Sequence, residues 1–312
     1  MKYTQKVIDA IFEMNKLGFS SRQIATELGV SKSGVNDLLK RETKGAKGEG
    51  VTKPKILIFD LETSAATVLA FGRNKQFISD DAVITEGGQI LTAAWKWLGE
   101  DDVYHYANID EITDKDDSSV CAILWELFEQ ADAVVAHNAL KFDVKVLRTR
   151  CLANGYPALP TVKILDTLIM AKKNFRFPTN RLNTLAEYFG FGSKEDTGGI
   201  SLWKDVQSGD KDALQKMIDY NLQDVLLLEK VYIALRSYGH SGSTFNHGHY
   251  SEGKEVCPVC GSDSIESTGR KVSTAVSVFE EVRCGGCGAV HRRRQAVNTK
   301  DQRAQIVVPI LN

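Results

Sequence analysis

The stretch "KILIFDLETSAA", residues 55–66, decides how the largest part of the chain folds. Its apolar run over residues 56–59 predicts a buried strand, and Asp60 and Glu62 follow immediately. Residues two apart in an extended chain point to the same side, so the two carboxylates repel each other. Burial at the end of an apolar strand disfavours their charge as well. Groups elsewhere in the chain must therefore stabilise this end of the strand.

The segment 55–238 is predicted to form one mixed α/β domain. Two further strand patterns follow the first and suit a meander, and after them helical and strand-like patterns alternate. The predicted strands after the first are 88–98, 102–108, 132–138 and 161–167, and the predicted helices are 119–130, 141–155, 181–191 and 212–239. Three strands followed by alternating helices and strands predict a mixed sheet with helices packed on its faces.

The composition indicates a soluble globular protein, with 312 residues of which 43% are hydrophobic and 25% charged. No apolar run reaches the roughly 18 residues of a spanning helix, and the N-terminus lacks a hydrophobic signal region. We therefore expect a cytosolic protein without a membrane partner, in which Cys121 and Cys151 are free buried thiols. The modular layout suggests a bacterial or phage setting. The ends of the chain are mildly basic and its middle is acidic. The ends could therefore attract the phosphates of a nucleic acid and the middle could bind cations. The alternative is that this is ordinary surface charge.

Residues 1–41 predict a small all-α module, and residues 42–54, rich in Gly and Lys, a flexible linker. Two short helices joined by "LGVS" resemble a DNA-binding helix-turn-helix. The side chains that the last helix would present to DNA are Ser31, Lys32, Ser33 and Asn36. The alternative is a three-helix packing or protein-docking bundle.

Two more carboxylates have helpful neighbours. Asp143 begins the helix after "HNALKFD", and Asp224 lies in "YNLQD" together with Tyr220. Residues four apart on a helix share a face, so Tyr220 and Asp224 project together, and the apolar neighbours of Asp224 aim it inward. Converging carboxylates suit Mg²⁺ or Mn²⁺, and two such ions about 3.5–4 Å apart clamp a phosphodiester during displacement.

In chain order, "FDLET", "HNALKFD" and "YNLQD" resemble the three motifs of the DEDD superfamily of 3'-5' exonucleases, which have the ribonuclease H-like fold. The resemblance covers residues 55–238. The third motif has the form Tyr-x-x-x-Asp, and Asp219 stands where the other subclass has His. The chain is therefore similar to the tyrosine subclass, which includes the exonuclease domains of family-B DNA polymerases and their stand-alone relatives.

The resemblance implies a role for each acidic position. Asp60 would bridge two metal ions, Glu62 and Asp224 would hold the first, and Asp143 would bind the second mainly through water. Glu62 would also lie near the terminal 3'-hydroxyl, and Tyr220 would orient the attacking water. Taken singly, each of these residues is equally well a turn, cap or core residue, and only the three motifs together favour catalysis.

Other positions near the motifs are candidates for contact with the substrate. They are His137, Asn138, Thr63, Leu61 and Phe142, and Phe71, Phe77 and Trp95 are guesses for base-stacking surfaces. For His137 a structural role is equally favoured. Asp166, followed by Thr167 before a helix, is expected to be an N-cap rather than a catalytic group.

Near the C-terminus, "CPVCG" at 257–261 and "CGGCG" at 284–288 give two Cys-x-x-Cys pairs. Thiolates at this spacing suit tetrahedral Zn²⁺, and the glycine after each second cysteine suits a tight turn. The pattern resembles a zinc ribbon over residues 255–295, with Cys257, Cys260, Cys284 and Cys287 as ligands. His247, His249 and His291 become candidate ligands only if one cysteine is not used. Residues 239–254 are expected to be a linker, and residues 296–312 stay unassigned. The basic run 292–294 is expected either to contact nucleic acid or a partner protein, or to be solvated.

These observations favour a metal-dependent 3'-5' exonuclease that acts on DNA with a single-stranded 3' end and releases nucleoside 5'-monophosphates. The expected cofactors are two Mg²⁺ or Mn²⁺ ions and one structural Zn²⁺. A polymerase or another replication or repair protein is a candidate partner. The alternatives are a structure-specific endonuclease or an RNA exonuclease on the same fold, or a non-catalytic DNA-binding adaptor. The helix-turn-helix favours DNA, because a groove-reading helix suits B-form duplex.

Overall fold

The computed structural model describes residues 53–72, 77–192, 199–239 and 244–310, with residues 21–30 and positions 7, 10, 11, 14, 32 and 35 nearer the N-terminus. The chain divides into two compact units, residues 1–53 and 54–312, which are described separately. Among the described residues no helix is long and apolar enough to cross a bilayer.

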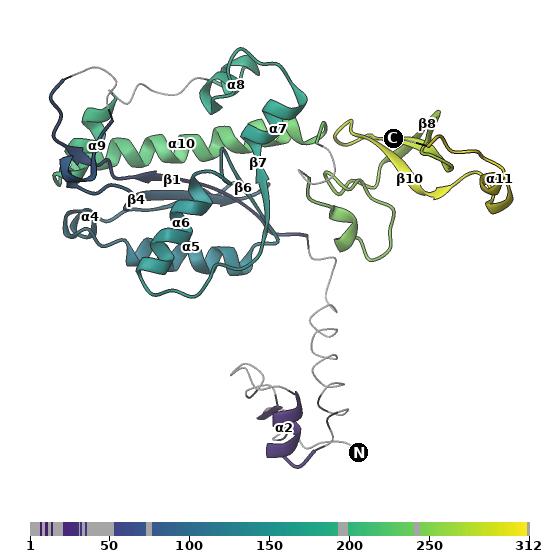
Figure 1. Ribbon diagram of the computed structural model, residues 1–312, viewed down its shortest axis with the longest axis horizontal. Helices are drawn as coiled ribbons and strands as arrows, with labels where there is room; N and C mark the ends of the chain where they lie inside the picture. Colours follow the sequence, from purple (N-terminus) through teal and green to yellow (C-terminus); the bar gives the residue numbers. More distant parts are fainter. Residues whose placement is uncertain are drawn as a thin grey trace. The chain divides into compact units, whose positions relative to one another are not determined.

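The second unit is built on a five-stranded mixed sheet with the strand order β5-β4-β1-β6-β7 (Figure 1). β5, β4 and β1 are antiparallel neighbours, whereas β1, β6 and β7 run parallel. The strands are β1 (Ile56–Thr63), β4 (Ile90–Trp97), β5 (Tyr104–Tyr106), β6 (Ala133–Ala136) and β7 (Lys163–Asp166), and a small separate pair is formed by β2 (Thr67–Val68) and β3 (Val83–Thr85). The predicted meander and the mixed α/β class are confirmed.

Helices cover both faces of this sheet (Figure 1). On one face lie α5 and α6, and on the other the long helix α10 runs beneath α7 and α8. The helices are α4 (Ile109–Asp114), α5 (Ser118–Gln130), α6 (Asp143–Ala153), α7 (Thr167–Asn174), α8 (Leu182–Tyr188), α9 (Ile200–Gln207) and α10 (Lys211–Arg236), with a short 3-10 turn at Asp80–Ala82. Each strongly periodic helix predicted from the sequence is present, with ends shifted by at most three residues.

Alternation along β1 decides which face each of its side chains meets. Leu57, Phe59 and Leu61 are buried against α5 and α6, whereas Ile56 and Ile58 are buried in the cluster that contains α7, α8 and α10. Because side chains in a strand alternate, the residues at 60 and 62 continue the second set. Both carboxylates of β1 therefore belong to the face that α10 covers.

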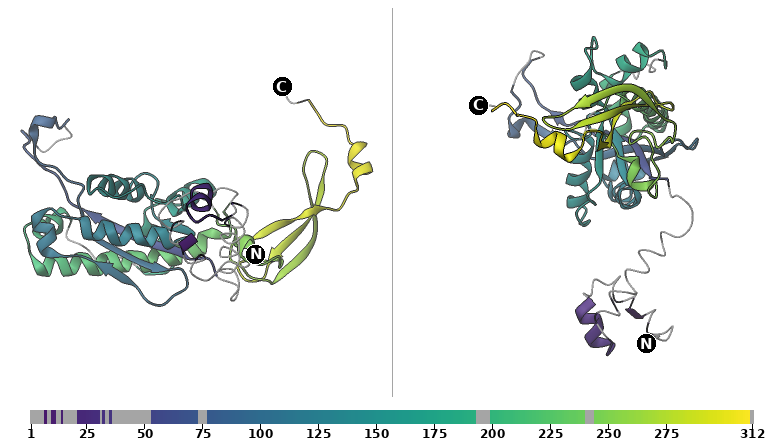
Figure 2. Two further views of the ribbon diagram at one scale, coloured as in Figure 1. Left: turned by 90° about the horizontal axis from the view of Figure 1, so that it is seen from below. Right: turned by 90° about the vertical axis from the view of Figure 1, so that its right-hand side faces the viewer.

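A second, three-stranded antiparallel sheet has the order β10-β9-β8, and its two hairpins are seen in Figure 2. Its strands are β8 (Ile265–Ser273), β9 (Val278–Cys284) and β10 (Val290–Ala296), and α11 (Lys300–Ala304) follows with a capping box at Thr299. The core of this module is small and consists mainly of two cysteines, Val259 and Ala289. A core this small buries too little apolar surface to stabilise the module by itself. The module therefore needs a further source of stability.

The predicted linker 239–254 is held by packing and hydrogen bonds in the part that the structure describes. Phe245 is buried in the same cluster as α10, and η2 (His247–Tyr250) follows it. The Tyr250 hydroxyl donates to Asp132 Oδ1 at 2.6 Å, and the His247 N–H donates to the Pro258 carbonyl at 2.9 Å. One aromatic anchor and these hydrogen bonds fix a segment whose Gly, Ser and His composition predicts a flexible chain.

In the first unit the structure describes helix α2 (Ser21–Glu27), where a helix is predicted. Ile11, Ile24 and Val35 are fully buried in one cluster, which gives the described part a helical core. Lys32 is exposed and helical. Ser31, Ser33 and Asn36 lie outside the described residues, so the helix-turn-helix stays a prediction.

A buried ionic cluster fixes α5 and α6 to the sheet. Asp117, only 1% exposed, accepts hydrogen bonds from Arg150 Nε at 2.6 Å, from Arg150 Nη2 at 2.8 Å, and from the Asn154 amide at 2.7 Å. It also accepts the Ile90 N–H at the start of β4. Burial favours a higher pKa, but the hydrogen bonds from Arg150, Ile90 and Asn154 hold the pKa of Asp117 below its ordinary value.

We expect Asp117→Ala to lower the free energy of unfolding by about 3–5 kcal/mol, because it leaves the Arg150 charge without its buried partner. The lowered pKa means that Asp117 stabilises the fold above its ordinary pKa and loses this contribution as the pH falls through the folded-state pKa. Wild-type protein should therefore lose more stability than the variant between pH 7 and pH 3. Urea unfolding followed by tryptophan fluorescence tests this, since all four tryptophans lie in this domain. The exposed Asp114→Ala is the control, and an equal effect of both variants would contradict the assignment.

Candidate active site and zinc centre

Three of the four predicted acidic residues converge at the end of β1. Asp60, Glu62 and Asp224 each offer a carboxylate oxygen, and these oxygens all lie within 4.8 Å of one another. Two come from β1 and the third from α10, which packs on the same face of the sheet. Asp224 is only 4% exposed, as its apolar helical neighbours predict. Oxygen ligands at this spacing suit a hard divalent cation, which also cancels the repulsion between them.

A buried amide orients Asp60. Asn221 is 1% exposed and donates its side-chain N–H to Asp60 Oδ2 at 2.8 Å. The Thr92 hydroxyl of β4 donates in turn to Asn221 Oδ1 at 3.2 Å. Such a chain fixes the direction of a metal-binding carboxylate. Sequence reasoning missed Asn221 as a functional residue, although it lies directly after Tyr220 inside "YNLQD".

Asp143 is outside the group of three but next to it. It opens α6 and is 2% exposed, and the backbone N–H of Leu61, the residue between the two carboxylates of β1, favours its charged form. Among the described residues its Oδ2 has no hydrogen-bond partner. Burial raises the pKa of Asp143 to about 7, and the Asp166 carboxylate adds to the rise. A buried carboxyl with one unpaired oxygen beside three clustered carboxylates fits a position that binds a cation through water.

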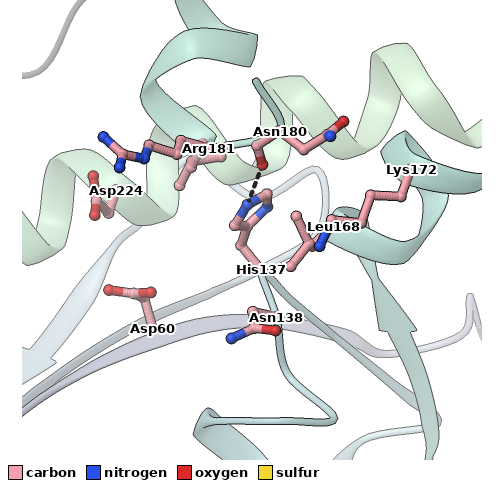
Figure 3. Close-up of a pocket in the computed structure, with 9 residues that line it drawn as sticks. Asp60, His137, Asn138, Leu168, Lys172, Asn180, Arg181 and Asp224 are labelled. Carbon is pink, nitrogen blue, oxygen red and sulfur yellow. Dashed lines mark hydrogen bonds between the residues drawn. The ribbon is translucent and has the colours of Figure 1, made fainter. Parts of the chain in front are cut away.

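A pocket of about 450 Å³ opens beside the acidic residues. Figure 3 shows Asp60 and Asp224 at one end and Lys172 at the other, with the Arg181 guanidinium beside Asp224. The remaining lining residues are His137, Asn138, Leu168, Asn180 and Leu182. Two cationic side chains and clustered carboxylates therefore share one cavity, which is the combination that a phosphodiester and its metal ions require. Lys172 was not predicted. The segment 181–191 was expected to shape the wall of the site, but no role was predicted for the Arg181 side chain.

His137 holds the wall of this pocket. Its Nε2–H donates to the Asn180 carbonyl at 2.9 Å, and its Nδ1 lies 2.9 Å from the Thr167 hydroxyl. Both ring nitrogens thus have protein partners, which favours the structural role over direct substrate contact. Asp166 is the N-cap of α7, as predicted, and accepts the N–H groups of Leu168 and Ile169. It also accepts the N–H of Asn138, which has a φ of 72° and lines the pocket.

The other predicted site residues lie in different environments. Tyr220 is half-buried on α10, and Thr63 is half-buried next to a register shift at Glu62/Thr63. Phe142 is exposed just before α6, whereas Leu61 is buried against α5 and α6. Alternation along β1 thus turns the Leu61 side chain away from the acidic residues, which leaves only its backbone for contact with substrate.

The three aromatic guesses also separate. Trp95 pairs with Phe59 across the strands and packs toward α5 and α6, so it does not face the acidic residues. Phe71 and Phe77 are fully exposed beyond β2 and before β3. Of these three aromatic residues, only Phe71 and Phe77 have a ring surface available for stacking with a base.

The four cysteines of the C-terminal module form a second candidate metal site. Their sulfur atoms lie within 4.8 Å of one another, with 3.7 Å between Cys257 and Cys287 and 3.6 Å between Cys260 and Cys284. Sulfurs on a tetrahedron with zinc bonds of about 2.3 Å are about 3.8 Å apart, so the spacing fits Zn²⁺. Gly261 and Gly288, each directly after a second cysteine, have φ values of 79° and 74°, as the tight turns require.

The histidines near this site are not needed as ligands. His291 Nε2 lies 3.3 Å from Cys257 Sγ, close enough to donate a hydrogen bond to a thiolate. His247 packs against Gly261, and burial lowers the pKa of His247 to about 4. In the basic run, Arg293 pairs with Glu255 and Glu280, and the Arg292 guanidinium lies over the Phe279 ring at 3.9 Å.

Comparison with known proteins gives one family match and a distant structural similarity. Residues 85–236 match the sequence model of a family described as the RNase_H superfamily, a span that contains Asp143, Tyr220 and Asp224 but begins after β1. No curated protein matches the chain. The family B DNA polymerase from the hyperthermophilic archaeon Pyrobaculum calidifontis is similar at 16% identity and a TM-score of 0.41, over 59% of this chain and 25% of the polymerase, so the chain spans a quarter of that protein. Residues 85–236 are therefore similar to the RNase_H superfamily, and the mixed sheet with its flanking helices is consistent with a ribonuclease H-like fold.

Proposed function

We propose that the protein is a metal-dependent 3'-5' exonuclease that acts on DNA and releases nucleoside 5'-monophosphates. The observation that carries this proposal is the convergence of Asp60, Glu62 and Asp224 within 4.8 Å beside a pocket that also contains Lys172 and Arg181. The ribonuclease H-like domain supports a nuclease. The order of the three motifs and the tyrosine in the third support the 3'-5' exonuclease reaction.

Each residue has a proposed part in the reaction. Asp60, Glu62 and Asp224 would hold the first Mg²⁺ or Mn²⁺, Asp60 would also serve the second ion, and Asp143 would serve that ion through water. Such ions make a bound water acidic and neutralise charge on the phosphodiester. Tyr220 is proposed to orient the attacking water. Asn138 and Thr63 are proposed to contact the terminal nucleotide, and Phe142 its neighbour.

The pocket cations and the terminal modules are proposed to position the strand. Lys172 and Arg181 line the pocket beside the acidic residues, where they attract the phosphates of the substrate. The N-terminal module is proposed to bind DNA through Ser31, Lys32, Ser33 and Asn36, and the zinc ribbon to hold one structural Zn²⁺. The preference for DNA over RNA rests on the helix-turn-helix alone.

Hydrolysis of matched linear and circular single strands tests the proposed function. With Mg²⁺ or Mn²⁺, a 5'-labelled linear strand should be shortened one nucleotide at a time from its 3' end, and the circular strand should stay intact because it has no end. A strand with a blocked 3'-hydroxyl is the matched control. Cleavage of the circle would instead indicate an endonuclease, and faster loss of an RNA strand of the same sequence would contradict the DNA preference.

A further inference from the structure

A second cavity, of about 700 Å³, is lined in part by the segment that follows β1. Its walls come from the segment after β1, from β3, from the end of α4 and from α9. The lining residues are Ala65, Ala66, Thr67, Val68, Thr85, Lys115, Ile200, Ser201, Lys204, Gln207 and Ser208. None of them lines the pocket beside Asp60 and Asp224, so the two cavities are distinct.

The cavity is fixed relative to the acidic residues through the backbone. Ala65 lies three residues after Glu62, which corresponds to about 10 Å of extended chain. The Gln207 side chain accepts the Ala65 N–H at 3.0 Å and donates to the Ala65 carbonyl at 3.1 Å. This pair of bonds holds α9 against the chain that leaves β1. The distance from the acidic residues to the cavity is therefore set by the fold.

The chemistry of the walls suits a nucleotide. Among the described residues that line the cavity none is acidic, although the segment 51–244 has more acidic than basic side chains. Lys115 and Lys204 supply positive charge, and hydroxyl groups stand beside them. Ala65, Ala66 and Val68 form an apolar part. Positive charge and hydroxyls bind a phosphate, and an apolar surface accommodates a sugar or a base.

Lys115 has an unusual backbone for its residue type. It ends α4 in the left-handed region with a φ of 58°, a position where glycine is the relaxed residue. Its N–H bonds the Glu111 and Ile112 carbonyls, so the turn itself needs only the backbone. The lysine charge at the end of α4 is favourable to the helix dipole, but a left-handed lysine has a conformational cost that glycine avoids, which is consistent with a function in the cavity.

We propose that this second cavity binds a phosphodiester-linked nucleotide of the same single strand whose 3' end lies at the acidic residues. The inference rests on the proposed function, since it assumes a strand at Asp60 and Asp224. Lys115 and Lys204 contact the phosphates upstream of the scissile bond. The cavity therefore adds affinity for strands long enough to reach it and adds nothing for a dinucleotide.

Binding of single strands of increasing length tests the proposal. Fluorescence anisotropy of 5'-labelled oligothymidylates on the Asp60→Asn chain measures affinity without cleavage. Affinity should rise with length, and Lys115→Gly with Lys204→Ala should weaken binding of the longer strands about tenfold and leave the dinucleotide unchanged. The slope of log K against log salt should flatten by about 0.7 for each phosphate that the variant no longer neutralises. Lys115→Gly relaxes the backbone at this turn, so this substitution is not expected to destabilise the domain.

The matched control is Lys216→Ala with Lys230→Ala, two exposed lysines of α10 that line neither cavity. An equal loss of affinity in the control, or unchanged length dependence in the cavity variant, overturns the proposal. Hydrolysis by the wild-type chain separates it from the proposed function. If the cavity variant loses affinity for long strands but the wild-type chain hydrolyses none, the exonuclease is refuted and the binding site is retained. If the wild-type chain hydrolyses the strand and the cavity variant binds as wild type does, the binding site is refuted and the exonuclease is retained.

Discussion

Asp60→Asn and Asp224→Asn, each made singly, are expected to lower the rate of 3'-end hydrolysis by at least about 10³-fold. Loss of one preorganised electrostatic group costs about 10²–10³ in rate, and these residues hold the ions on which the whole reaction depends. The amide keeps the size of the side chain and removes one negative charge from a group of three. The measurement is the initial rate on a labelled strand at saturating Mn²⁺.

A binding readout separates loss of the metal from loss of the fold. Mg²⁺ or Mn²⁺ at about 100 times its dissociation constant should stabilise the wild-type domain by about 2.7 kcal/mol, and the Asn variants should lose this gain. Without added metal the variants should unfold at the wild-type temperature or above, because one repulsive charge is gone. The matched control is Asp219→Asn, an exposed residue of the same helix that accepts a bond from Gln215. Full activity in both site variants would refute the proposed mechanism.

Removal of zinc is expected to unfold the C-terminal module and leave the ribonuclease H-like domain folded. Structural zinc contributes about 10–16 kcal/mol of apparent binding free energy in small modules, more than the few buried side chains around these cysteines can supply. We therefore expect one Zn²⁺ per chain by elemental analysis and none in Cys257→Ser with Cys284→Ser. Limited proteolysis should then cut within residues 265–296, while tryptophan fluorescence keeps its folded-state value.

The control for this experiment is Cys121→Ala, a buried thiol between α5 and α6 that is remote in sequence from the four-cysteine group. It should retain the full zinc content. Retained zinc in the double serine variant, or protease resistance of the ribbon after chelation, would contradict a four-cysteine structural site.

The elements that could be predicted are those with strong local patterns. β1, α5, α6 and α10 have long apolar periodicities, and the Cys-x-x-Cys pairs with their glycines define two turns without reference to the rest of the chain. Short elements such as β2, α4 and α9 were not predicted. They depend on neighbours distant in sequence, such as the bonds between Gln207 and Ala65. The order of the two halves of β1, apolar then acidic, was sufficient to locate the acidic end of the sheet.

By itself the sequence determined the mixed α/β class, the acidic positions and the two Cys-x-x-Cys pairs, because alternation in strands, helical spacing and short-range cysteine spacing are local properties. Only the tertiary structure decided that Asp224 joins Asp60 and Glu62 while Asp143 lies outside this group, that Asn221 orients Asp60, and that Leu61 turns away. It also placed Lys172, Arg181, Lys115 and Lys204 in two cavities. The physical reason is that an exposed lysine or arginine carries no local signal, and its function arises only when the packing of distant elements brings it beside a charged partner.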